Sequence, residues 1–388
     1  MASWRNSVIR IGHLIDTRFD RLRYGLRRRL GYDQPLQVVP YDGYGDAKTL
    51  FLSGRVLEDH GPSDTADHET LWNNLVASYR RFESDEVPGL RVRATFQGRS
   101  SETVTDEEGY FDFELPVVQP LDPSAQWHSV EFDVPPQAML KRPPPEPIAG
   151  RVLVPSPDCD FGVISDIDDT LLITGATRLL TMARLTFLRS PHTRLPFNGV
   201  AAFYQALRDG AAHPRPIFYV SSSPWNLYDF LVDFMALNRI PAGPLLLRDL
   251  GLPAERAGGS SHQAHKLAQI ERIMNIYPRL PFILIGDSGQ HDPEAYARVV
   301  STRPRQVRAI YIRDVTQAPE RDREIAALAR WTRLHNIDLL LVENTLQAAE
   351  HAAQNGYIHP ERLASISADA AKDAGPPGPV ERAVERDD

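Results

Sequence analysis

Apolar runs alternate with helix-forming stretches from about residue 158 to residue 367. The apolar runs fall at residues 161–164, 216–220, 244–247, 282–285, 307–312 and 337–342. Between them, apolar residues recur at helical spacing in residues 200–209, 225–237, 264–276, 319–334 and 346–355. Continuously apolar strands separated by helices are typical of a parallel sheet buried on both faces. We therefore predict an α/β domain over residues 158–367, with helices on both faces of the sheet.

Residues 35–136 follow a different pattern, in which strands alternate with turns. Residues 49–57 and 90–97 are strand-like, and after the turn at Gly109 the apolar Phe111 and Phe113 alternate with polar neighbours. This pattern indicates a small β-sandwich domain of the transthyretin-like or immunoglobulin-like type, with a helical insertion at residues 69–82. It contains no recognisable catalytic group of residues, so we expect it to support the chain or to bind a protein partner.

Three further segments flank these two domains. Residues 1–34 form a basic segment with arginines between apolar residues at helical spacing, which fits a helix lying on an anionic membrane or a helix packed against the protein itself. Residues 137–157 continue a proline-rich stretch and are predicted to be a semi-rigid linker. Residues 368–388 are rich in Ala, Gly, Pro and charge, which predicts a disordered tail.

Charge and cysteine content narrow the classes of function. The chain has 388 residues and a net charge of −8, so we expect no nucleic-acid partner. The single cysteine, Cys159, excludes both an intramolecular disulfide and a cysteine-based metal cage. No apolar run is long enough to span a bilayer, and the N-terminus lacks the features of a signal peptide. We therefore expect a cytoplasmic protein, with residues 1–34 as the candidate for peripheral contact with a membrane.

The first candidate for chemistry follows the first apolar run of the α/β domain. Asp166 stands at the predicted strand end, and Asp168 can reach the same space once the chain turns. One carboxylate of such a pair can attack phosphorus while the other transfers protons. With Thr170, the two aspartates form a D-x-D-x-T motif.

Further polar residues follow the later strands, whose carboxyl ends meet at one edge of a parallel sheet. Ser221 ends the second strand, where a hydroxyl can donate to a phosphoryl oxygen. Lys266 begins a helix and can neutralise the nucleophile and the phosphoryl group. Asp287 and Asp292 follow the fourth strand and can complete, with Asp166, an oxygen-rich magnesium site.

The order of these motifs resembles that of the haloacid dehalogenase (HAD) superfamily of phosphatases. Acidic pair, serine, lysine and second acidic pair occur in the superfamily's order, each at the appropriate strand end or helix start. The local sequences of residues 166–170, 219–228 and 285–292 further resemble the actin-patch-type phosphatidate phosphatase family. This resemblance covers about residues 158–315. It implies a HAD-like Rossmannoid parallel sheet, and phosphatidate as substrate with diacylglycerol as product.

The resemblance also implies a mechanism and a cofactor. Asp166 would be the nucleophile that forms an aspartyl-phosphate, and Asp168 would be the acid and then the base. Mg²⁺ would be the metal ion. The expected catalytic residues are Asp166, Asp168, Ser221 and Lys266; the expected metal ligands are Asp166, Asp168, Asp287 and Asp292; the expected substrate-binding residues are Thr170, Ser221, Ser222 and Lys266.

Other functions remain open from the sequence alone. The substrate can be a phospholipid, or a soluble or protein-bound phosphomonoester. A non-catalytic scaffold that binds partners through the β domain is a second alternative, although a scaffold has no need to keep both Asp166 and Asp168. Transfer of the phosphoryl group to an acceptor other than water is a third.

Overall fold

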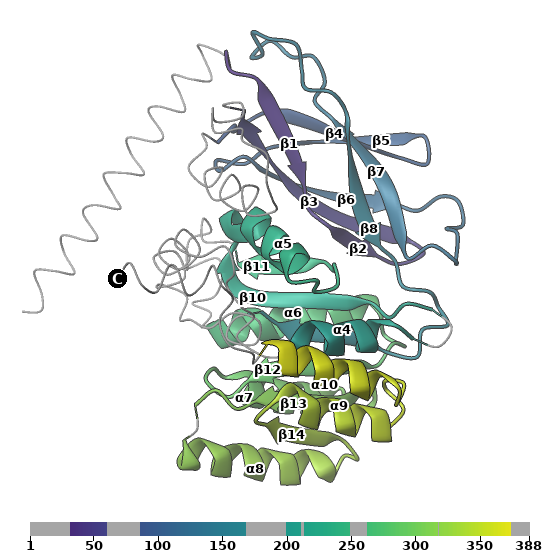
Figure 1. Ribbon diagram of the computed structural model, residues 1–388. Coiled ribbons are helices and arrows are strands. Elements are labelled where there is room, and N and C mark those ends of the chain that lie inside the picture. The colour runs from purple at the N-terminus through teal and green to yellow at the C-terminus, as the bar shows by residue number, and fades with distance from the viewer. Residues whose placement is uncertain are drawn as a thin grey trace, which may run out of the picture.

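The structure is a computed structural model, and it describes residues 32–59, 86–167, 199–210, 213–248, 262–316 and 318–373. The predicted basic segment, apart from its last residues, the predicted helical insertion at residues 69–82 and the end of the predicted tail lie outside these ranges. The described chain has a β-rich N-terminal region above an α/β region (Figure 1). Among the described residues, no helix is long and apolar enough to cross a membrane.

The described residues of the N-terminal region include eight strands that hydrogen bonds join into one sheet. The strands are β1 (Leu36–Pro40), β2 (Gly43–Gly45), β3 (Thr49–Glu58), β4 (Arg91–Phe96), β5 (Arg99–Val104), β6 (Tyr110–Pro116), β7 (Trp127–Asp133) and β8 (Ile148–Leu153). The alternation predicted after Gly109 is confirmed, because Phe111, Phe113 and Leu115 are buried while their neighbours are more exposed. The β-rich character is thus confirmed, and the sandwich assignment stays a prediction.

The predicted linker at residues 137–157 differs from the structure. Strand β8 lies inside it and pairs antiparallel with β7 and parallel with β2, so this stretch is an interior part of the sheet. Its prolines stand outside the paired residues of β8, where the lack of a backbone N–H breaks no ladder hydrogen bond. The density of prolines around the strand concealed the strand itself.

The α/β region is built on a six-stranded parallel sheet. Its strands are β9 (Gly162–Asp166), β10 (Ile217–Pro224), β11 (Leu245–Arg248), β12 (Phe282–Asp287), β13 (Val307–Arg313) and β14 (Asp338–Val342). The spatial order is β11-β10-β9-β12-β13-β14, and every neighbouring pair is parallel. The chain first moves outward from β9 in one direction and then in the other. Ligand sites of such sheets form where the order reverses, at the carboxyl ends of the strands.

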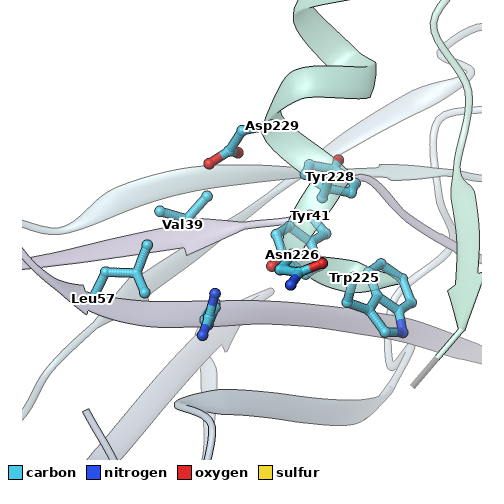
Figure 2. A pocket seen from close by; sticks show the side chains of 8 residues that line it. Val39, Tyr41, Leu57, Trp225, Asn226, Tyr228 and Asp229 are labelled. Atoms are coloured by element: carbon cyan, nitrogen blue, oxygen red, sulfur yellow. The ribbon is translucent and has the colours of Figure 1, made fainter. Parts of the chain in front are cut away.

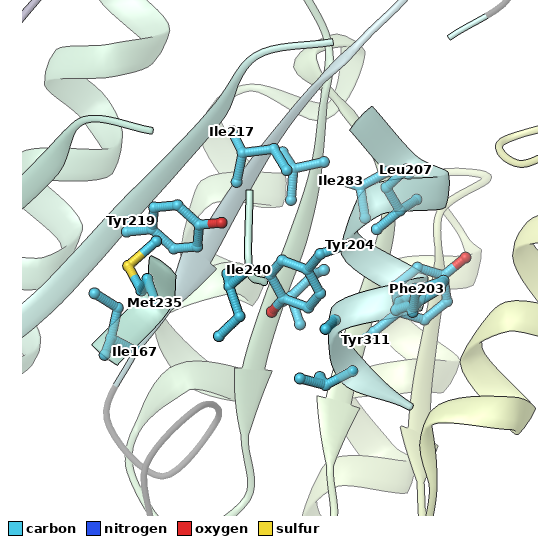
Figure 3. Packing of buried hydrophobic residues seen from close by; sticks show 14 of the residues in the cluster. Ile167, Phe203, Tyr204, Leu207, Ile217, Tyr219, Met235, Ile240, Ile283 and Tyr311 are labelled. Carbon is cyan, nitrogen blue, oxygen red and sulfur yellow. The ribbon is translucent and has the colours of Figure 1, made fainter. Parts of the chain in front are cut away.

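Helices cover both faces of this sheet, as predicted. They are α4 (Val200–Arg208), α5 (Tyr228–Leu237), α6 (His262–Ile276), α7 (Asp292–Thr302), α8 (Pro319–Arg333), α9 (Thr345–Gln354) and α10 (Arg362–Asp373), with short 3₁₀ turns at Trp225–Leu227 and Pro304–Gln306. A hydrophobic core lies on each face of the sheet, and successive residues of a strand point into different cores. Ile285 belongs to the core formed with α4, α5, α9 and α10, and Leu284 belongs to the core formed with α6, α7 and α8. Figure 3 shows part of the first core, where Tyr204 of α4 lies near Ile240.

Two helices were not anticipated. Helix α7 begins at Asp292 with Pro293 in its first turn, a start signal that the sequence does carry. Helix α10 extends through Asp373, so part of the predicted disordered tail, which began at residue 368, is ordered. Ile366 of α10 is fully buried in the core beneath α4 and α9, and this packing explains why an alanine-rich polar segment stays helical here.

Candidate active site

Three carboxylates meet at the edge of the parallel sheet. Asp166 ends β9, Asp287 ends β12, and Asp292 begins α7. Each offers a carboxylate oxygen, these oxygens lie within 4.8 Å of one another, and all three residues are buried. The tertiary structure thus gathers three of the four residues that the sequence indicated for a metal site. The fourth, Asp168, lies outside the described residues, as does Thr170.

Lys266 of α6 enters the same cluster. Its Nζ atom is 2.9 Å from Asp166 Oδ1 and 2.5 Å from Asp292 Oδ1, and the side chain is almost fully buried. One ammonium cannot balance the charge of three carboxyl groups when all are ionised, and an excess of negative charge in a region of low dielectric constant is costly unless another cation is present. The donor set consists of oxygens only, the ligands that hard divalent cations prefer. The described residues therefore fit a divalent metal ion.

Buried serines border the carboxylates on the neighbouring strand. In the parallel register Val220 of β10 is paired with Asp166 of β9, so Ser221 follows directly beyond the nucleophile candidate. Ser221 and Ser222 are buried, and Ser221 Oγ accepts a hydrogen bond of 2.9 Å from the backbone N–H of Ser223. This bond holds the Ser221 hydroxyl oxygen against the backbone at the end of β10.

Comparison with known proteins gives a family for this part of the chain. Residues 161–314 match the family described as "Phosphatidate phosphatase APP1, catalytic domain". These residues are thus similar to that catalytic domain. The match contains Asp166, Ser221, Lys266 and Asp287, and it confirms the family resemblance that their order indicated.

Two curated relatives extend the comparison. Phosphatidate phosphatase APP1 of Saccharomyces cerevisiae is 35% identical over 170 residues, which is 42% of this chain and 28% of the relative. An uncharacterized protein of Schizosaccharomyces pombe is 24% identical over 250 residues, which is 62% of this chain and 40% of the relative. The chain thus spans well under half the length of either relative. A crystal structure of a carbohydrate acetylesterase from Xanthomonas citri aligns over 69% of this chain and 66% of its own, with 12% identity and a TM-score of only 0.23.

Within the residues that match this family, the loop between β12 and α7 has a defined geometry. Asp287 Oδ1 accepts hydrogen bonds from the backbone N–H groups of Gly289 and Gln290, at 2.7 and 2.9 Å. The backbone N–H of Asp287 donates to Asp292 Oδ2 at 3.1 Å. The two aspartates are therefore oriented by the same short loop, and a change in its path would move both candidate metal ligands.

Arg321 of α8 supports this loop from outside. Its guanidinium donates to the backbone oxygens of Ser288 and Gln290, at 3.0 and 2.9 Å, and it forms a two-point ion pair with Glu294 of α7. The hydrogen bonds to Glu294 raise the pKa of Arg321 further above its ordinary value. Arg321 cannot be recognised from the sequence, because an arginine within a later helix belongs to no local motif.

Two tyrosines lie beneath the cluster. Burial, and then the negative charges of Asp292, Asp166 and Asp287, raise the pKa of Tyr296 well above its ordinary value, and its hydroxyl donates to the Ile285 carbonyl at 2.8 Å. Burial likewise raises the pKa of Tyr204, whose hydroxyl lies 2.6 Å from Ser165 Oγ. Both phenols remain neutral at physiological pH, so they add no further negative charge to the carboxylates.

Gly286 is required by the close approach of Asp292. A Cβ atom at position 286 would lie 2.8 Å from Asp292 Cβ and 2.9 Å from its Cγ. We expect Gly286→Ala to displace Asp292 and to lower the free energy of unfolding by about 1–3 kcal/mol, the usual cost of overpacking. Urea unfolding followed by circular dichroism measures this change. Equal stability of the variant and the wild type would show that the loop tolerates the methyl group.

Proposed function

We propose that the chain is a Mg²⁺-dependent phosphatase with a HAD-like catalytic domain, and that it hydrolyses a phosphomonoester through an aspartyl-phosphate on Asp166. The observation that carries the proposal is the buried cluster of Asp166, Asp287 and Asp292 around Lys266, at the carboxyl edge of the sheet. Phosphatidate is the proposed substrate, because the matching family and the yeast relative are both described as phosphatidate phosphatase. Diacylglycerol would then be the product.

In this mechanism, a carboxylate oxygen of Asp166 attacks phosphorus in line, and the bond between phosphorus and the ester oxygen breaks. Asp168 gives its proton to the leaving alkoxide and then takes a proton from the water that hydrolyses the aspartyl-phosphate. The second step releases inorganic phosphate and restores the Asp166 carboxylate. Acid and base roles of one carboxyl group in successive steps are usual in such double displacements.

The remaining residues stabilise charge. Lys266 and the Ser221 hydroxyl donate to the transferring phosphoryl oxygens, with Ser222 and Thr170 completing the phosphate-binding set. Asp166, Asp287 and Asp292, with the backbone carbonyl of Asp168, would hold Mg²⁺. When bound, Mg²⁺ lowers the repulsion between the carboxylate nucleophile and the phosphate dianion. The proposal does not depend on membrane contact by residues 1–34 or on a protein partner of the β-rich region.

Phosphate release by the purified chain tests the proposal. We expect faster release from phosphatidate in mixed micelles than from a soluble aryl phosphate, complete loss of activity in EDTA, and recovery when Mg²⁺ is added back. Activity that survives EDTA would contradict the metal requirement. Release from the aryl phosphate alone would keep the chemistry and overturn phosphatidate as the substrate, in favour of a soluble phosphomonoester.

A further inference from the structure

The turn between β1 and β2 inserts the aromatic side chain of Tyr41 from the β-rich region into the α/β region. The ring of Tyr41 stacks on Trp225, with 5.1 Å between ring centroids and an interplanar angle of 1°. The same ring lies 3.9 Å from the centroid of Tyr228. Figure 2 shows Tyr41 between these two residues of the α/β region. Tyr41 is only 5% exposed and belongs to the hydrophobic core of the catalytic domain.

A hydrogen bond reinforces the stacking. The backbone N–H of Asp42 donates to the Tyr228 hydroxyl at 2.7 Å, and the Asp42 carboxylate is itself held by Arg151 of β8 at 2.6 Å. A series of contacts from Arg151 of β8 through Asp42 to Tyr228 therefore links the sheet of the β-rich region to the first turn of α5. Because the backbone of Asp42 makes the contact, its position depends on the fold of the whole β1–β2 turn.

The contacted residues follow directly after the serines of the candidate active site. Ser221, Ser222 and Ser223 lie in the last half of β10, Trp225 begins the 3₁₀ turn that ends the strand, and Tyr228 begins α5. Only one residue, Pro224, separates the buried serines from the stacked Trp225. A displacement of Trp225 and Tyr228 would therefore move the serine hydroxyls.

The space between these groups is too small for a substrate. The cavity lined by Val39, Tyr41, Arg55, Leu57, Trp225, Asn226, Tyr228 and Asp229 has room for about one water molecule. A cavity of this size, lined by stacked rings, is a small gap in a packed interface and not a ligand pocket.

We infer that the β-rich region acts as an internal clamp on residues 221–224, the end of β10 that carries the proposed phosphate-binding serines and is called the serine loop below, with Tyr41 as the positioning residue. Tyr41 acts through Trp225 and Tyr228 and has no contact with the reacting atoms. The role in phosphate binding rests on the proposed phosphatase function, whereas the mechanical link between Tyr41 and the serine loop does not. The clamp assigns a role to the β-rich region, which carries no recognisable catalytic motif.

The test uses the full chain and compares four variants. Tyr41→Ala and Tyr41→Leu remove the stacked ring, and the second keeps more apolar volume in case the first folds poorly. Tyr41→Phe keeps the ring and is expected to retain wild-type behaviour. Tyr277→Phe is the matched control, because the Tyr277 hydroxyl donates to the Gly45 carbonyl across the same interface, away from the serine loop.

We expect Tyr41→Ala and Tyr41→Leu to speed hydrogen–deuterium exchange in residues 221–228, and to lower phosphate release about 10- to 100-fold, the range typical of a small misplacement of a binding group. Inhibition by inorganic phosphate should weaken, while the Mg²⁺ concentration for half-maximal activity should stay the same, because Asp287 ends β12, which lies on the other side of β9 from β10. A general loss of structure would change both quantities together.

The outcomes separate the clamp from the proposed function. Unchanged exchange in residues 221–228 of Tyr41→Leu, or an equal effect of Tyr277→Phe, would overturn the clamp. If the wild type releases no phosphate from any substrate, the proposed function fails, while the exchange measurement still decides whether Tyr41 holds the serine loop.

Discussion

Replacing Asp166 with asparagine is expected to lower the rate of phosphate release roughly 10⁴-fold or more, as loss of a catalytic nucleophile does in other hydrolases. An amide oxygen is a poor nucleophile towards phosphorus, and the variant also loses the carboxylate that faces Lys266 at 2.9 Å. Initial rates with saturating Mg²⁺ measure this effect. Circular dichroism of the same samples establishes that the variant is folded.

Asp160→Asn provides a matched control for this experiment. Asp160 precedes the opposite end of β9, and its carboxylate pairs with Arg215 at 2.7 Å, far along the strand from the cluster. We expect this variant to keep nearly wild-type activity, because the same chemical change is made outside the site. Full activity in Asp166→Asn would show that another group attacks phosphorus, and the mechanism built on Asp166 would be wrong.

Replacing Lys266 with methionine is expected to destabilise the protein and to slow the reaction. Without the ammonium, Asp166 and Asp292 remain buried and lose a shared cation at 2.9 and 2.5 Å. Removing one partner of a buried ion pair costs about 3–5 kcal/mol. Loss of a cation that faces the transferring phosphoryl group is expected to lower the rate about 10²- to 10³-fold, as for other groups that stabilise developing charge.

Urea unfolding in EDTA and in Mg²⁺ measures the loss of stability in this variant, and initial rates measure the loss of activity. We expect Mg²⁺ to stabilise Lys266→Met more than the wild type, because the bound cation replaces part of the missing positive charge. Lys141→Met, at an exposed lysine, should change stability by no more than about 0.5 kcal/mol. If Lys266→Met is as stable as Lys141→Met, the carboxylates do not need the ammonium.

The sequence was sufficient for the architecture of the catalytic domain. Each of its six predicted strands and five predicted helices is present, because continuous apolar runs and helical periodicity are local properties of the chain. Motif order also identified Asp166, Lys266, Asp287 and Asp292 as one group before any distance was known. Strand ends in a parallel sheet share one edge, so their positions along the chain predict which residues can meet.

Two segments could not be predicted in this way, because their amino-acid composition favours a structure different from the one they adopt. Strand β8 lies among prolines, and the helix up to Asp373 has the composition of a tail. Both are held by packing against residues distant in the chain, such as the pairing of β8 with β7 and the burial of Ile366. Tertiary contacts override weak local preferences, and no pattern within these segments records them.

The sequence by itself determined which residue types stand at the strand ends, and hence the chemistry available at the edge of the sheet. Only the tertiary structure decided which groups orient them: Arg321 holds the loop between Asp287 and Asp292, and Tyr41 stacks beside the serine loop. The physical reason is that the position of each motif residue, at a strand end or a helix start, follows from the local sequence around it. Their supports come from elements far away in sequence, and only the tertiary fold brings those elements into contact.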